Sequence, residues 1–130
     1  MAVTHSTAAR NAATDAVTAL ISTSGNLVFR ISPSSVGSPG TAVATLPLSA
    51  TAFAASSSGT ATANAITSDT NAAGNASAVA FATLQTSAAV IVIHCAVAAS
   101  GSDINMTGGL TVAAGDTVSC SSLTYTALSA

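Results

Sequence analysis

The spacing of the apolar residues changes once along the chain, near residue 26, and this change constrains the fold more than any other feature. Before it, apolar side chains recur at the spacing of one helix face, at Ala9, Ala13, Ala16, Val17, Leu20 and Ile21. Ser6 is a candidate N-cap and Gly25 follows the segment, so we expect one helix over residues 6–21. A narrow, alanine-rich stripe is marginal alone, so this helix needs a partner surface, either its own sheet or another chain.

Beyond residue 26 the apolar residues alternate with polar ones, which is typical of strands. Gly, Pro and Ser turn signals separate the expected strands, which lie at 26–32, 42–48, 60–67, 79–84, 89–97, 104–106, 110–112 and 117–126. We therefore predict a mainly β fold: a single β-sandwich or flattened barrel of about seven to eight short antiparallel strands after one N-terminal α-helix. Residues 1–130 form a single domain in this interpretation, with the β part over 26–130. A β-solenoid is disfavoured because no fixed internal period is present.

Three details refine the expected sheet. Residues 89–97 are apolar on both faces, which predicts a central strand with both faces covered. Pro47 indicates an edge strand or a strand end, and the apolar phase shifts within 117–126, which indicates a bulge. We expect four aromatic side chains in the core: Phe29, Phe53, Phe81 and Tyr125.

The side chains are small and almost uncharged, which excludes several functions. The 130 residues include 31 Ala, 20 Ser and 19 Thr, and 5% are charged, against about 25% in ordinary domains. With two cations and a net charge of −2, the chain cannot neutralise a phosphate backbone, so nucleic-acid binding is not expected. The apolar run at 88–99 is shorter than the roughly 20 residues that span a bilayer, so no membrane insertion is expected.

Such a surface suits contact with other proteins. Ser, Thr, Asn, Gly and Ala side chains pack closely against a neighbour and lose little hydration in doing so. We interpret the chain as a subunit that is docked for most of its life, and a weakly charged monomer is the alternative.

Few residues are available for chemistry. His94 and Cys95 are adjacent, so in a strand they face opposite sides and form no dyad. Cys95 and Cys120 are expected as buried free thiols. We expect turn or capping roles, rather than metal ligation, for Asp69, Asp103 and Asp116. These residues predict no enzyme, no metal, no cofactor and no small-molecule substrate.

The two arginines are candidate interface residues. Arg10 lies off the helix stripe, and Arg30 lies on the strand face opposite Phe29. Two interpretations stay open for each: pairing with an acid on a neighbouring chain, or a solvated side chain. Together with Ala9, Ala13 and Val17 of the stripe, they make up the predicted interface.

Three passages of the chain resemble a group of small virion proteins of tailed bacteriophages. They are Met1–Val17, leading to Gly25–Arg30; Thr60–Thr70; and Gly101–Met106, followed by Ala114–Ser119 and Ser122–Thr126. Members of this group are similar to capsid decoration or cement proteins, and no catalytic motif comes with them. One passage differs, since the group often has a charged hairpin where this chain has the uncharged residues Leu84–Val90.

The resemblance implies a structural virion protein on the capsid surface, made in the cytoplasm of the host bacterium. Its expected partners are the major capsid protein and copies of itself, with neighbouring capsomers clamped together. The interface is expected at the Ala-rich helix, at the Ser34–Gly40 loop or at a free sheet edge, and salt should weaken it little. A tail, neck or fibre component is the first alternative, and a carbohydrate-binding or adhesin module is a remote one.

Overall fold

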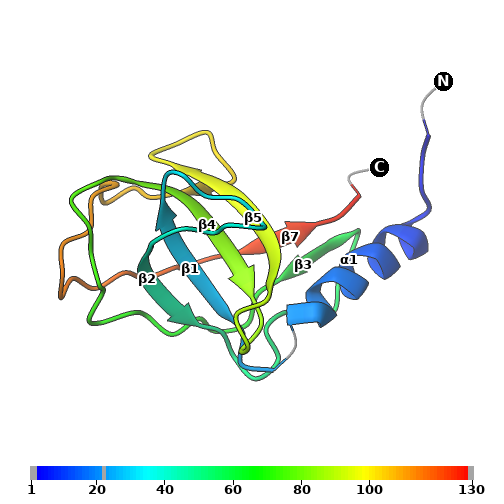
Figure 1. Ribbon diagram of the computed structural model, residues 1–130. Coiled ribbons are helices and arrows are strands. Elements are labelled where there is room, and N and C mark those ends of the chain that lie inside the picture. Colours follow the sequence, from blue (N-terminus) through cyan, green and yellow to red (C-terminus); the bar gives the residue numbers. More distant parts are fainter. Residues whose placement is uncertain (1–2, 22, 129–130) are drawn as a thin grey trace.

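The computed structural model describes residues 3–21 and 23–128, and it is mainly β with one N-terminal helix, as predicted (Figure 1). The helix, α1, spans Thr7–Ile21. Ser6 caps it as expected, because the Ser6 Oγ accepts a hydrogen bond from the Ala9 amide at 3.2 Å. Over these described ranges, no helix is both long enough and apolar enough to cross a membrane.

Seven strands follow within the described residues, in one five-stranded sheet and one two-stranded ribbon. Their bounds are β1 Asn26–Ile31, β2 Ala42–Pro47, β3 Thr60–Thr62, β4 Val79–Gln85, β5 Ile91–Ala98, β6 Ile104–Asn105 and β7 Thr124–Thr126. The sheet has the order β2-β1-β4-β5-β6, and the ribbon pairs β3 with β7. The sheet curls into a half-barrel, and the ribbon lies against α1 (Figure 1).

The pairing is mixed, so the prediction of an all-antiparallel fold is wrong at one strand. β6 runs parallel to β5, with Val97 opposite Ile104. The connection at 99–103 makes a loop instead of a hairpin turn, with Gly101 at a φ of +68°. The Asp103 carboxylate accepts a hydrogen bond from the Ala96 amide at 2.9 Å, and this bond holds the returning chain beside β5.

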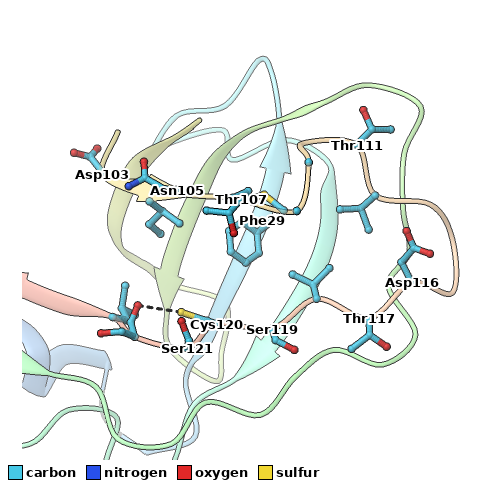
Figure 2. Close-up of a pocket in the computed structure, with 18 of the residues that line it drawn as sticks. Phe29, Asp103, Asn105, Thr107, Thr111, Asp116, Thr117, Ser119, Cys120 and Ser121 are labelled. Atoms are coloured by element: carbon cyan, nitrogen blue, oxygen red, sulfur yellow. Dashed lines mark hydrogen bonds between the residues drawn. The ribbon is translucent and has the colours of Figure 1, made fainter. Parts of the chain in front are cut away.

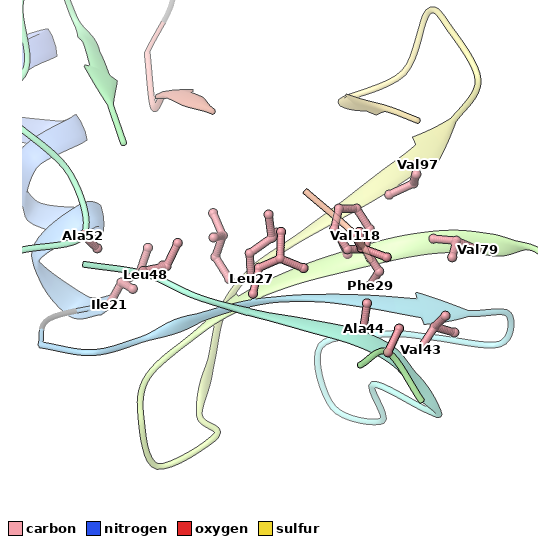
Figure 3. Packing of buried hydrophobic residues seen from close by; sticks show 14 of the residues in the cluster. Ile21, Leu27, Phe29, Val43, Ala44, Leu48, Ala52, Val79, Val97 and Val118 are labelled. Carbon is pink, nitrogen blue, oxygen red and sulfur yellow. The ribbon is translucent and has the colours of Figure 1, made fainter. Parts of the chain in front are cut away.

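The hydrophobic core lies on one face of the curled sheet (Figure 3). The strands contribute most of its buried residues: Leu27, Phe29, Val43, Ala44, Leu46, Val79, Ala82 and Leu84. Irregular segments close the core with Val112 and Val118. Phe29 and Phe53 are buried as predicted, whereas Phe81 and Tyr125 are half-buried.

A polar cluster around Arg30 lies on the other face of the sheet. The Arg30 side chain is 8% exposed; its Nε donates to Thr83 Oγ1 at 3.0 Å and its Nη2 to Gln85 Oε1 at 2.9 Å. Its Nη1 donates to the Gly40 carbonyl at 2.8 Å. Gly40 belongs to the β1–β2 loop, so this bond draws the loop over the sheet and covers the polar side chains beneath it.

β4 is the middle strand of the sheet, and β5, like β1, has a neighbour on each side, but the prediction that both faces of 89–97 are covered is wrong. β5 is next to the end of the sheet, and its residues from Ile91 to Cys95 are only half-buried. Its neighbour β6 is short and pairs with Val97 and Ala98 alone. The apolar run of β5 is therefore only partly covered. β1 and β4 are more deeply buried, although they carry the polar residues Arg30, Thr83 and Gln85.

Several other strands are shorter than expected. Strand 60–67 is reduced to β3 with isolated bridges at Ala63 and Ile66, and strand 117–126 is reduced to β7 with a bridge at Val118. No strand forms at 110–112, where single carbonyls accept hydrogen bonds from other segments. Pro47 ends β2, an outer strand of the sheet, as predicted.

Replacement of Arg30 tests the importance of the polar cluster. Arg30→Met removes all three donors and leaves the buried oxygens of Thr83 and Gln85 without them, so we expect a loss of about 3 kcal/mol in the free energy of unfolding. Arg30→Lys keeps the charge but not the planar fork, so its loss is smaller. Urea denaturation measures both, and an Arg30→Met variant as stable as the wild type would contradict this role.

Candidate protein-interaction surface

The helix is fastened to the rest of the chain through polar side chains. Thr14 is fully buried; its Oγ1 donates to the Gly59 carbonyl at 2.6 Å and accepts from the Ala127 amide at 3.1 Å. Asn11 Oδ1 accepts from the Gly59 amide at 2.7 Å. Gly59 has a φ of +82°, and a Cβ there would lie 2.9 Å from Arg10 Nε. Glycine therefore allows the turn at 56–60 to approach the helix this closely.

Arg10 and Asp15 strengthen the same attachment. The Arg10 guanidinium donates to the carbonyl oxygens of Ser58 and Leu128. Asp15 Oδ1 accepts from the Ser56 amide at 2.9 Å. These bonds join α1 both to the turn before β3 and to the segment after β7.

Because α1 turns its polar side inward, most of its apolar stripe faces outward. We call the outward residues the helix stripe; they are Ala9, Ala13, Ala16, Val17 and Leu20. Leu20 is 63% exposed, Ala9 and Ala16 are exposed, and Ala13 and Val17 are half-buried. Only Ile21, at the end of the helix, enters the core. A shallow groove of about 330 Å³ beside the helix is lined by residues 50–55 and by Asp15, Thr18, Ala19 and Thr23.

The five predicted interface residues lie in two different settings. Ala9, Ala13 and Val17 belong to the helix stripe. Arg10 and Arg30 instead donate to neutral oxygens within their own chain, and desolvation lowers the pKa of the Arg30 guanidinium. Their contact with a neighbouring chain stays a prediction, as does the role of the stripe.

The two cysteines are free thiols with raised pKa values. Cys95 and Cys120 are both half-buried. Desolvation, with a smaller effect of the Asp103 charge, raises the pKa of Cys95 to about 11. Desolvation also raises the pKa of Cys120, although its hydrogen bond to the Ser122 carbonyl opposes the shift. Both thiols are therefore poor nucleophiles at neutral pH.

His94 and Cys95 face opposite sides of β5 and do not form a dyad. The His94 ring lies 5.0 Å from the Phe81 ring, between centroids, and its Nε2 is 2.9 Å from Ser34 Oγ. Cys95 Sγ donates to the Ala82 carbonyl at 3.4 Å. The histidine thus helps to hold the β1–β2 loop over the sheet.

The three turn aspartates hold main-chain amides, as their positions predict. Asp69 accepts from Asn71 and Thr45, Asp103 from Ala96, and Asp116 from Ala113, at 2.9–3.0 Å. Within residues 3–21 and 23–128, no three His, Cys, Asp or Glu side chains gather as they would around a metal ion.

A larger cavity, of about 480 Å³, lies between the segments 103–112 and 116–124 (Figure 2). Hydroxyl groups line much of it, from Thr107, Thr111, Thr117, Ser119, Ser121, Ser122 and Thr124. Phe29 lies between the two walls in Figure 2, with Asp103 towards one end and Asp116 towards the other. We call this cavity the seam groove.

Two features of this surface were not predicted from the sequence. The polar attachment of α1 does leave a signal, because its four residues also recur at helical spacing: Arg10, Asn11, Thr14 and Asp15. The seam groove leaves no signal in the sequence, since it depends on which segments fail to pair.

No family model matches the chain, and neither the curated proteins nor the solved structures contain a match to it.

Replacement of Thr14 tests the polar attachment. Thr14→Val keeps the shape but leaves the Gly59 carbonyl and the Ala127 amide without this partner, so we expect a loss of about 1–3 kcal/mol in the free energy of unfolding. Thr18→Val is the matched control, because the Thr18 hydroxyl bonds only to Asp15 within the helix. Equal losses for the two variants would contradict the attachment described here.

Thiol labelling tests the environment of Cys95. In a Cys120→Ser variant at pH 8, a pKa of about 11 in place of 9.0 lowers the thiolate fraction about a hundredfold. We expect iodoacetamide to alkylate the folded protein far more slowly than the urea-unfolded protein. Similar rates in both states would contradict the raised pKa.

The same shift makes stability depend on pH. The Cys95 thiol releases its proton near pH 9 in the unfolded chain and near pH 11 in the folded chain. The contribution of Cys95 to the free energy of unfolding is therefore complete below pH 9 and is lost as the pH rises towards 11. In urea denaturation at pH 8 and pH 10.5, we expect Cys95→Ala to lose less stability between the two pH values than the wild type.

Proposed function

We propose that this chain is a structural virion protein: a capsid decoration or cement protein that binds the outer shell of a tailed-phage head and stabilises contacts between capsomers. The observation that carries the proposal is the uncharged helix stripe, of which the rest of the described chain leaves Ala9, Ala16 and Leu20 exposed. Its partners in this proposal are the major capsid protein and copies of itself, on the capsid surface.

Small uncharged side chains suit this role. Ala9, Ala13 and Ala16 allow another backbone to come close, and Val17 and Leu20 add apolar area that contact removes from water. A symmetric shell repeats each contact many times, so weak individual contacts add up through avidity. A stripe without charge also loses little binding free energy when salt screens electrostatic attraction.

The resemblance to phage virion proteins supports the same proposal and names no catalytic group. In the described residues the thiols carry raised pKa values and His94 contacts Ser34 and Phe81, which supports a role without catalysis. The flattened barrel expected from the sequence is part of the proposal, because the curled sheet and the segments beside β2 make up most of such a barrel. A tail, neck or fibre component is the alternative within the virion.

Localisation on purified particles tests the proposal. Mass spectrometry of phage particles that contain this chain, followed by cryo-electron microscopy, should place it in many symmetric copies on the outer face of the head shell. A wash in 1 M NaCl should leave it bound. Density confined to the tail or neck would favour the alternative, and particles without the chain would contradict the proposal.

A charge placed in the helix stripe tests the contact surface. Leu20→Asp changes a side chain that is 63% exposed, so the fold should be kept. An unpaired carboxylate in an apolar contact costs several kcal/mol, so we expect occupancy on the shell to fall at least tenfold. Val90→Asp, at a residue 60% exposed in the β4–β5 turn, is the matched control and should bind normally. Equal occupancy of the two variants would contradict docking through the helix.

A further inference from the structure

The half-barrel is closed by hydrogen bonds around its circumference except at one place. The five sheet strands run from β6 to β2. Beyond β2, the segment 67–74 bonds to Pro47 and Val43, and the same segment bonds in turn to Asp116 and Val118. Among the described residues, no main-chain hydrogen bonds join segment 117–122 to β6 or to the loop after β6. The seam groove lies between these two segments.

One wall of the seam groove carries main-chain groups that lack partners within the described chain. No main-chain hydrogen bond joins residues 119–121 to another described residue, and bonded groups begin again at Leu123. The other wall is formed by β6 and by the turn at 107–108. An open edge beside a gap provides the donors and acceptors that an added strand uses.

The groove also has a definite chemical character. Its base is apolar, with Phe29 only 2% exposed and Met106 and Leu123 half-buried. Its lining residues include no Lys, Arg or His, while Asp103 and Asp116 lie towards opposite ends (Figure 2). The groove is therefore negative at its ends and uncharged in the middle.

We propose that the seam groove binds an extended segment of a partner protein, with small or β-branched residues in the centre and a basic residue at each end, which pairs with residues 119–121 as an added strand. Main-chain hydrogen bonds to residues 119–121 hold the segment, and Asp103 and Asp116 select its ends. This inference uses a different surface from the helix stripe and does not depend on the partner being a capsid protein.

The charges favour a partner of another kind over a second copy. Both arginines of this chain already donate to internal carbonyl or side-chain oxygens. A second copy therefore has no free cation among its described arginines to place beside Asp103 or Asp116. The hydroxyl lining and the open wall favour a peptide over a small apolar ligand, which would bind in a mostly apolar pocket.

Peptide binding tests the inference on the whole chain. The probe is the capped heptapeptide Arg-Ser-Val-Thr-Val-Ser-Arg, and its controls carry Glu at both ends or N-methyl groups on the central amides. Calorimetry should show saturable binding of the basic peptide, at least tenfold weaker binding of the acidic one, and none of the N-methylated one. Amide chemical-shift changes should be confined to residues 103–124 and to the strands directly beneath them.

Matched variants separate the end charges from the rest of the groove. Asp103→Asn with Asp116→Asn keeps oxygen acceptors for the Ala96 and Ala113 amides and removes both charges, so the preference for the basic peptide should disappear. Asp15→Asn makes the same kind of change at α1 and should leave the preference intact.

Three results would overturn the inference. The first is no saturable binding of the basic peptide. The second is shift changes centred on α1 or the ribbon. The third is self-association through residues 103–124, which would make a second copy the occupant. None of these results depends on whether the helix stripe binds a capsid.

Discussion

The buried guanidinium of Arg30 is the constraint on which the rest of the sheet depends. It lies in β1, a strand with neighbours on both sides, and its partners are neutral oxygens of Thr83, Gln85 and Gly40. A buried cation needs its donors satisfied, so the β1–β2 loop must fold over the sheet to supply the Gly40 carbonyl. With that face covered, the opposite face of the same strands is free to form the only large apolar core of the described chain.

The attachment of the helix follows the same rule of satisfied polar groups. Thr14 and Asn11 bond to the main chain of Gly59, and Arg10 reaches carbonyls on two segments. Of the apolar side of this helix, Ile21 alone packs into the core. The helix stripe is thus available for a partner, which links the packing of the chain to its proposed role.

Much of the fold could be predicted from the sequence, because local periodicity decides it. The helix with its Ser6 cap, the strands β1, β2 and β4, and the burial of Phe29 and Phe53 follow from spacing alone. The order of the strands could not be predicted in this way. The apolar run of β5 indicates a strand covered on both faces, but its residues 91–95 are half-buried. β1 and β4 instead bury polar side chains whose partners, such as Gly40, come from other parts of the chain.

The candidate site was predictable to a smaller degree. Ala9, Ala13 and Val17 were recognised as a stripe, but the inward turn of the polar side depends on contacts with residues 56–60 and 127–128. The seam groove exists because 117–122 and β6 do not pair, and unpaired main chain leaves no mark in the residue types. A search for a second stripe of polar residues at helical spacing would have found the attachment of α1.

Hydroxyl-radical footprinting of α1, on the free protein and on assembled particles, tests the central claim most directly. It reports the solvent exposure of individual side chains. If the helix stripe is the docking surface, Leu20 and Val17 should be oxidised readily in the free protein and protected in the particle, with Val90 labelled in both. Equal oxidation of Leu20 in the two states would contradict the claim.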